Sequence, residues 1–218
     1  MSQAPTPVAA RSPQRLLLGG GIAAGPLFLA AGLAQGLTRE GFDFGRNALS
    51  QLSLGPLGWI QIGVFLLTGV LLIAGAVGVR HALRGAPGGV WAPRLIGVFG
   101  ASFLVAGVFT ADPGAGFPEG APETAAPDMS LQGAVHMLGG MIGYLALCAA
   151  LLVLARYFSG RGERRWALVC RLVPVAVLAG FAGSGVAVAA FTAGAGLGLL
   201  GLSAVLARLA VPPPAGRP

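Results

Sequence analysis

The sequence predicts an all-α membrane protein, a polytopic bundle of six transmembrane helices joined by short loops. Charged residues make up 10% of the 218 residues and hydrophobic residues 55%, whereas about a quarter of a soluble domain is charged. The hydrophobic residues stand in continuous blocks of about 20, the length that crosses a bilayer as a helix. These blocks do not alternate over about ten residues, as the strands of an outer-membrane barrel do. The basic residues, all arginines, gather in alternate loops, as the positive-inside rule describes.

The first two predicted spans are Leu16–Leu37 and Trp59–Val79. The segment before them, residues 1–15, is rich in Pro, Ala and Ser and is predicted to be a disordered cytoplasmic tail. A cleaved signal peptide is the alternative interpretation of the first span, but its apolar run is longer than a signal h-region. Small residues recur four positions apart within this span, as close helix packing requires: Gly21, Gly25, Gly32 and Gly36.

The third and fourth predicted spans are Leu95–Ala111 and Leu131–Ala155. The last apolar block, Trp166–Ala210, would be about 65 Å long as one helix, whereas the hydrocarbon core is about 30 Å thick. We therefore expect two spans with a tight turn near 191–194. The six spans make one domain over residues 16–210, followed by a second disordered cytoplasmic tail, residues 211–218.

Orientation is predicted from the sidedness of the charges. One side holds Arg11, Arg15, Arg80, Arg84, Arg94, Arg156, Arg161, Arg164, Arg165, Arg171, Arg208 and Arg217, and the other holds Arg39 and Arg46. The positive-inside rule then places both termini in the cytoplasm, as expected for a multi-pass protein of the cell (plasma) membrane. Acids favour the outer side: Glu40, Asp43, Asp112, Glu119, Glu123 and Asp128.

The partners expected from these charges are lipids. The cytoplasmic cluster Arg156–Arg171 is predicted to meet anionic lipid headgroups. Nucleic-acid binding is not expected, because the arginines are scattered along loops rather than gathered in one basic patch. The oligomeric state is left open.

The densest polar stretch, residues 42–59, lies between the first two spans. Asn47, Ser50 and Gln51 share one face of a helical turn there, with leucines on another face. Gly55-Pro56 ends the turn before the second span. We interpret the stretch as a short amphipathic segment at the outer interface, forming the lid or rim of an outward-facing pocket. An ordinary interfacial loop is the alternative.

Polar side chains in and beside the spans gather toward the same outer side. His136 is the most unusual, because an ionisable group inside a span is expensive unless it is paired or lines a wet cavity. Asp112 is its candidate partner, and the alternative is that His136 only locks two helices through a carbonyl or carboxylate. The residues predicted to form the pocket are Asp43, Arg46, Asn47, Ser50, Gln61, Thr110, Asp112, Gln132 and His136.

Catalysis is neither supported nor excluded by these residues. If the protein is an enzyme, His136 would act as base, Asp112 would orient it and Ser50 would be the nucleophile, but no Gly-x-Ser-x-Gly elbow is present. No metal or cofactor is expected, because His81, the second histidine, lies on the opposite side. Both cysteines lie in apolar runs and are expected to pack in the core.

The stretch Arg46–Trp59 (RNALSQLSLGPLGW) resembles the signature of the domain of unknown function 998 family of prokaryotic six-helix membrane proteins. A second block, Gly107–Pro113 with His136, resembles that family's second conserved region. The resemblance covers about residues 16–210. It implies the fold and the membrane location but no activity, and it implies that Asn47, Ser50, Asp112 and His136 are characteristic polar positions.

Three functions remain open at this stage. The first is binding or transport of a small or lipid-like ligand in an outward-facing polar pocket. The second is a structural or accessory role in which the polar cluster only locks helices. The third is a membrane-embedded hydrolase or transferase acting on lipid or envelope substrates.

Overall fold

The computed structural model describes residues 13–124 and 129–211. Within these ranges the chain forms six α-helices and one short 3-10 helix and contains no β-strand, which confirms the predicted all-α class. The elements are α1 (Pro13–Thr38), η1 (Leu49–Ser53), α2 (Gly58–Ala82), α3 (Trp91–Val108), α4 (Leu131–Gly160), α5 (Arg164–Gly183) and α6 (Val188–Ala210). All six α-helices are long and apolar enough to cross a membrane.

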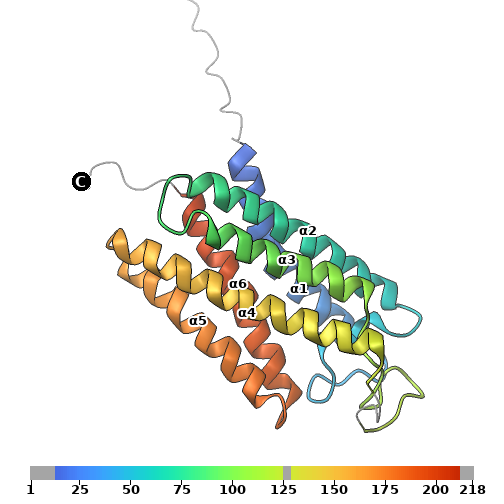
Figure 1. The fold of residues 1–218 in the computed structure, drawn as a ribbon. Coiled ribbons are helices and arrows are strands. Elements are labelled where there is room, and N and C mark those ends of the chain that lie inside the picture. Colours follow the sequence, from blue (N-terminus) through green and yellow to red (C-terminus); the bar gives the residue numbers. More distant parts are fainter. Residues whose placement is uncertain (1–12, 125–128, 212–218) are drawn as a thin grey trace, which may run out of the picture.

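The six helices form a closed ring in chain order (Figure 1). Each helix packs on its neighbours in sequence, and α6 returns to pack on α1. Large apolar side chains are exposed along the outside of the ring, among them Leu66, Leu138 and Leu172. Such a surface would be a liability in water, but lipid tails cover it in a bilayer. The chain is accordingly a multi-pass membrane protein.

Glycines allow the helices of the ring to approach at backbone distance. A Cβ built on Gly75 of α2 would lie 2.8 Å from the Cα of Gly21 in α1. A Cβ on Gly180 of α5 would lie 2.8 Å from the Cα of Gly194 in α6. Since carbon atoms pack at about 3.5–4.0 Å, neither position has room for a side chain. The prediction that small residues of the first span pack against other helices holds for Gly21 and Gly25. Gly32 and Gly36 instead pack against Leu49 of η1 and Phe44 of the following loop.

Several helix ends differ from the predicted spans, and the differences are largest at the start of α3 and the end of α4. The third helix begins at Trp91 rather than Leu95, because Pro93 is tolerated in a first turn, where its missing N–H is not needed. The fourth helix continues from Ala155 to Gly160. The cytoplasmic cluster Arg156–Arg171 is therefore mostly helical. Arg156 lies on α4, Arg161 in the turn, and Arg164, Arg165 and Arg171 on α5.

The turn between the last two helices was predicted about seven residues too late. It spans Ser184–Ala187, so Phe191–Gly194 lie within α6. The Gly183-Ser184-Gly185 sequence favours a turn here, and the hydroxyl of Ser184 donates to the carbonyl of Phe181 at 2.7 Å. Each of the two helices keeps enough length to cross the bilayer.

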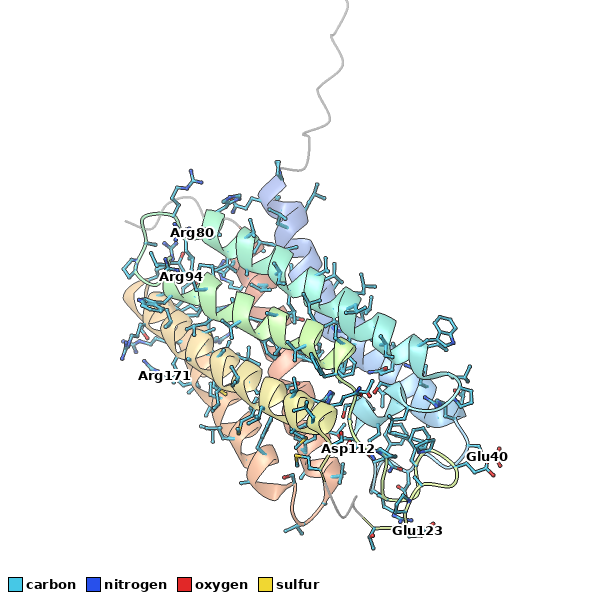
Figure 2. All side chains as sticks on the ribbon, turned by 45° about the vertical axis from the view of Figure 1, so that its right-hand side comes forward. Glu40, Arg80, Arg94, Asp112, Glu123 and Arg171 are labelled. Carbon is cyan, nitrogen blue, oxygen red and sulfur yellow. The ribbon has the colours of Figure 1, made fainter. Side chains whose placement is uncertain are left out.

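The charges separate to opposite ends of the bundle. Figure 2 shows Arg80, Arg94 and Arg171 at one end, hereafter the arginine end. The labelled acids lie at the other end, with the loop cap formed by residues 39–57 and 109–124 (Figure 2). Of the predicted charge pattern, Arg11, Asp128 and Arg217 lie outside the described residues, as do residues 1–12 and 212–218 of the predicted tails.

Candidate functional site

The loop cap is built by hydrogen bonds between its two long loops. The side chain of Asn47, 1% exposed, donates to the carbonyls of Gly114 (3.5 Å) and Ala115 (3.3 Å) and accepts from the amide of Asp43 at 2.9 Å. The amide of Gln51 also donates to the carbonyl of Gly114, at 3.1 Å. A buried amide with several main-chain partners holds loops in one arrangement. Asn47 therefore joins the loop after α1 to the loop after α3.

A second link between the two loops lies on the surface of the cap. The guanidinium of Arg46 donates to the carboxylate of Glu123 at 2.8 Å. That hydrogen bond, together with the nearby negative charge, raises the pKa of Arg46. Both side chains are largely exposed, and exposed ion pairs contribute little to stability.

Arg39, which the sequence analysis did not propose for the site, holds the end of the short helix η1. Its guanidinium donates to the carbonyls of Leu52 and Leu54, the latter at 2.6 Å. It also lies over the ring of Phe117, 4.9 Å from the centroid. Burial lowers the pKa of Arg39, although an arginine stays charged at neutral pH. The predicted amphipathic turn thus exists as η1, with Leu49 and Leu52 buried beneath it.

The carboxylate of Asp112 binds the start of α4. It does not orient the imidazole of His136. Its two carboxylate oxygens accept from the amide and the hydroxyl of Ser130, and the hydroxyl of Ser130 in turn accepts from the amide of Gly133 at 3.0 Å. Such side-chain caps satisfy amides that a helix start leaves free. The predicted pairing of Asp112 with His136 does not occur in the described structure.

His136 locks the end of α3 to the first turns of α4. Its Nδ1 lies 2.8 Å from the carbonyl oxygen of Phe109. Because a carbonyl only accepts, Nδ1 must carry the proton, so Nε2 of the neutral ring is an acceptor. The structure thus shows the alternative considered from the sequence, in which a carbonyl group binds this histidine. The imidazole also packs edge-on against Phe65.

A cavity of about 280 Å³ lies beside His136, inside the ring of helices. Its walls are almost entirely apolar, and all six helices and η1 contribute to them. The apolar residues that α1, α2, α3 and α6 contribute include Phe28, Leu29, Phe65, Phe103, Ala106 and Leu199. The size lies just below the range of about 300–1,000 Å³ that is typical of small-molecule sites.

The cavity opens through the side of the bundle near the loop cap. One side of the opening is α4, whose Met137 and Met141 line the cavity and are also exposed. The other side is the hairpin of α5 and α6, which contributes Phe181, Val188 and Phe191. Figure 1 shows that α4 and α5 lie together at the arginine end and diverge toward the loop cap. The opening therefore faces the surface that lipid tails would cover.

A buried pair of amides, which the sequence analysis recognised only in part, joins α1 to α2. Nε2 of Gln35 donates to Oε1 of Gln61 at 2.7 Å, and both residues are buried. Gln61 was predicted as a pocket residue, and its partner Gln35 was missed. The signal was available, because an amide inside an apolar span needs a partner. The pair does not line the cavity.

The predicted site residues are divided between these environments. Ser50 and His136 line the cavity. Asp43, Arg46, Asn47 and Asp112 hold the loop cap and the start of α4 together. Gln61 pairs with Gln35, Gln132 is exposed, and Thr110 follows the end of α3. Among residues 13–124 and 129–211, no three His, Cys, Asp or Glu side chains are grouped so that they could hold a metal ion.

A family model described as a protein of unknown function (DUF998) matches residues 22–212. This range includes all six helices except the first turns of α1. No curated protein and no solved structure matches the chain.

Proposed function

We propose that this chain, which belongs to the DUF998 family, binds a lipid-like ligand whose apolar chain occupies the cavity between α4 and the α5–α6 hairpin. The observation that carries the proposal is an apolar cavity that opens through the lipid-facing side of the bundle. A ligand dissolved in the bilayer reaches such an opening without crossing water. The site differs from the polar pocket expected from the sequence, because its walls are apolar.

The packing around the cavity supports a binding role. Buried cores are usually filled to the density of organic crystals, and empty space of this size lowers stability because its walls lack contact partners. Here Gly140 and Gly196 line the space, and a Cβ on Gly140 would meet no atom within 4 Å. Two methionines at the opening add side chains that adapt to different ligand shapes.

A structural role without a ligand is the second candidate. The observation that favours it is the bonding of the polar cluster, since Asn47, Asp112 and His136 all bind groups of the protein itself. Under this alternative the cavity would be a packing defect, and filling it with protein atoms would leave the function intact.

We also propose that the arginine end faces the cytoplasm of a cell whose plasma membrane holds the protein, as the positive-inside rule implies. Glu163, at this end, binds Arg161 at 3.2 Å and Arg208 at 2.7 Å. The exposed arginines of α5 that surround this group would then meet the anionic headgroups of the inner leaflet.

The cavity proposal is tested with a leucine placed inside the space. Gly140→Leu puts a side chain into the cavity, and Gly63→Leu is the matched control, because Gly63 is exposed on α2 and a Cβ there also meets nothing. The purified protein is placed in nanodiscs with a dodecyl chain that carries a terminal photoactivatable diazirine, and adducts are located by mass spectrometry.

We expect the wild type and Gly63→Leu to be labelled at lining residues such as Phe181 and Phe191. Gly140→Leu should lose this labelling while its lipid-facing surface is labelled as before. Equal labelling of the lining residues in all three proteins, or labelling restricted to the outer surface, would contradict the proposal.

A further inference from the structure

The polar side chains that line the cavity fall into two groups. In the first group the hydroxyl is already bonded to a main-chain carbonyl: Ser102 donates to Phe99 at 2.7 Å, Tyr144 to Ala195 at 3.3 Å and Ser184 to Phe181 at 2.7 Å. These three hydroxyls have donated their proton and offer a ligand at most a lone pair.

The second group comprises three polar atoms with no hydrogen bond to any described residue. Oγ1 of Thr192 is fully buried and has no partner. Nε2 of His136, on a residue 7% exposed, is the acceptor left over after Nδ1 binds Phe109. Oγ of Ser50, whose carbonyl accepts from Ser53, has no partner of its own. Buried polar atoms are usually paired. Of the three, Oγ1 of Thr192 is the one that is fully buried without a partner, and all three belong to residues that line the cavity.

All three atoms lie at the end of the cavity near the loop cap. Ser50 belongs to η1, within the cap itself. His136 and Thr192 lie in the second turns of α4 and α6, helices that both begin at this end. Phe28 of α1 and Leu199 of α6 lie further from the loop cap along their helices and line the deeper part of the cavity. The atoms without a hydrogen-bond partner therefore lie near the cap, whereas the hydroxyls deeper in the cavity, those of Ser102 and Tyr144, already bind carbonyls. This arrangement matches an amphipathic molecule.

The lining excludes a charged headgroup. None of the lining residues, all of which belong to the described part of the chain, is an arginine, aspartate or glutamate. A phosphate or carboxylate at this depth would have no opposite charge to compensate its desolvation.

We infer that the ligand is a lipid with an uncharged hydroxyl headgroup, whose hydroxyl donates to Nε2 of His136 and accepts from the hydroxyl of Thr192 or Ser50. This inference rests on the proposed function, because it names the ligand class of the same cavity. The apolar chain extends from these three atoms toward Phe28 and Leu199. A long-chain alcohol or an acylglycerol has this chemistry, and a phospholipid does not.

The test compares ligands that differ only in the headgroup. 1-Dodecanol, dodecyl phosphate and dodecane compete, at equal mole fractions in the nanodisc, with the dodecyl diazirine probe for labelling of the cavity. We expect dodecanol to compete about fivefold better than dodecane, the factor that one hydrogen bond of typical net strength provides. Dodecyl phosphate should compete no better than dodecane.

Two variants test whether Thr192 and His136 cause the preference for dodecanol over dodecane. Thr192→Val replaces an unpaired buried hydroxyl with a methyl group of similar shape, so the fold should be unaffected or stabilised. His136→Asn keeps an amide N–H at the position of Nδ1 for Phe109 but removes Nε2. Each variant should reduce the ratio of dodecanol to dodecane competition toward one. The ratio is taken within each variant, so that a change in the binding of the apolar chain affects both ligands alike.

The possible failures are distinct. If all three ligands compete equally in the wild type, or if Thr192→Val and His136→Asn keep the full dodecanol preference, the headgroup inference is wrong and the cavity proposal stands. If dodecyl phosphate competes best, the headgroup is anionic and the inference is wrong. If none competes and Gly140→Leu does not alter labelling, the proposed function itself fails.

Discussion

Replacement of Gly21 by alanine should separate α1 from α2. A Cβ at Gly21 would lie 2.9 Å from the Cα of Gly75 and 2.6 Å from Cδ1 of Leu206. The end of the Leu206 side chain can rotate away, but the backbone of Gly75 cannot. Carbon atoms pack at about 3.5–4.0 Å, so the two helix backbones must move apart by roughly 0.6–1.1 Å at this crossing.

Overpacking of this kind lowers stability by about 1–3 kcal/mol. The matched control is Gly19→Ala on the same helix, where a Cβ meets no atom within 4 Å. There alanine adds only its helix propensity, which contributes up to about 1 kcal/mol in an exposed helix. The free energy of unfolding is measured for both variants by titrating mixed micelles with a denaturing detergent.

We expect Gly21→Ala to unfold at a clearly lower detergent fraction than the wild type, and Gly19→Ala to unfold at the same or a higher fraction. Equal stabilities for the two variants would refute the argument, since they would show that α1 and α2 are not held at backbone contact by Gly21 and Gly75.

Two further predictions concern the loop cap and the topology. Asn47→Ala should lower the free energy of unfolding by about 2 kcal/mol, because it leaves buried main-chain groups unpaired. It should also speed hydrogen exchange at the amide of Asp43. The control is Arg46→Gln, which breaks an exposed ion pair between the same loops and should lower the free energy of unfolding by less than about 1 kcal/mol. A cap that loosens equally in both variants would contradict the distinction. A reporter fused after Pro218 should be active only in the cytoplasm, and activity outside the cell would overturn the proposed orientation.

The six spans could be predicted because bilayer thickness imposes a length on each helix, whatever its neighbours are. Helix ends were predicted less well, because hydropathy marks where apolar residues stop and not where backbone hydrogen bonding stops. Arg156–Gly160 illustrates this, since these residues continue α4 beyond its apolar part. The last turn was misplaced because two apolar helices joined by small residues show no polar gap.

The candidate site was only partly predictable for a related reason. Sidedness placed Asn47, Asp112 and His136 at one end of the bundle, which the structure shows. Sidedness does not assign partners, so the expected contact between Asp112 and His136 was wrong. Thr192 was not predicted as a site residue, because a single threonine in an apolar helix forms no sequence pattern that marks a site. Only the structure shows that its hydroxyl is buried without a hydrogen-bond partner.

The sequence by itself determined the fold class, the number of helices, the separation of charge between the two ends and the family. The first three follow from composition and periodicity, which local residue chemistry decides, and the family follows from the resemblance of Arg46–Trp59 to its signature. Only the tertiary structure showed which main-chain groups Arg39 and Asn47 bind within the loop cap. It also showed that α4 diverges from the α5–α6 hairpin to leave an apolar cavity. Such a space depends on how glycines and large side chains from six helices meet, and that arrangement is not encoded in any one helix.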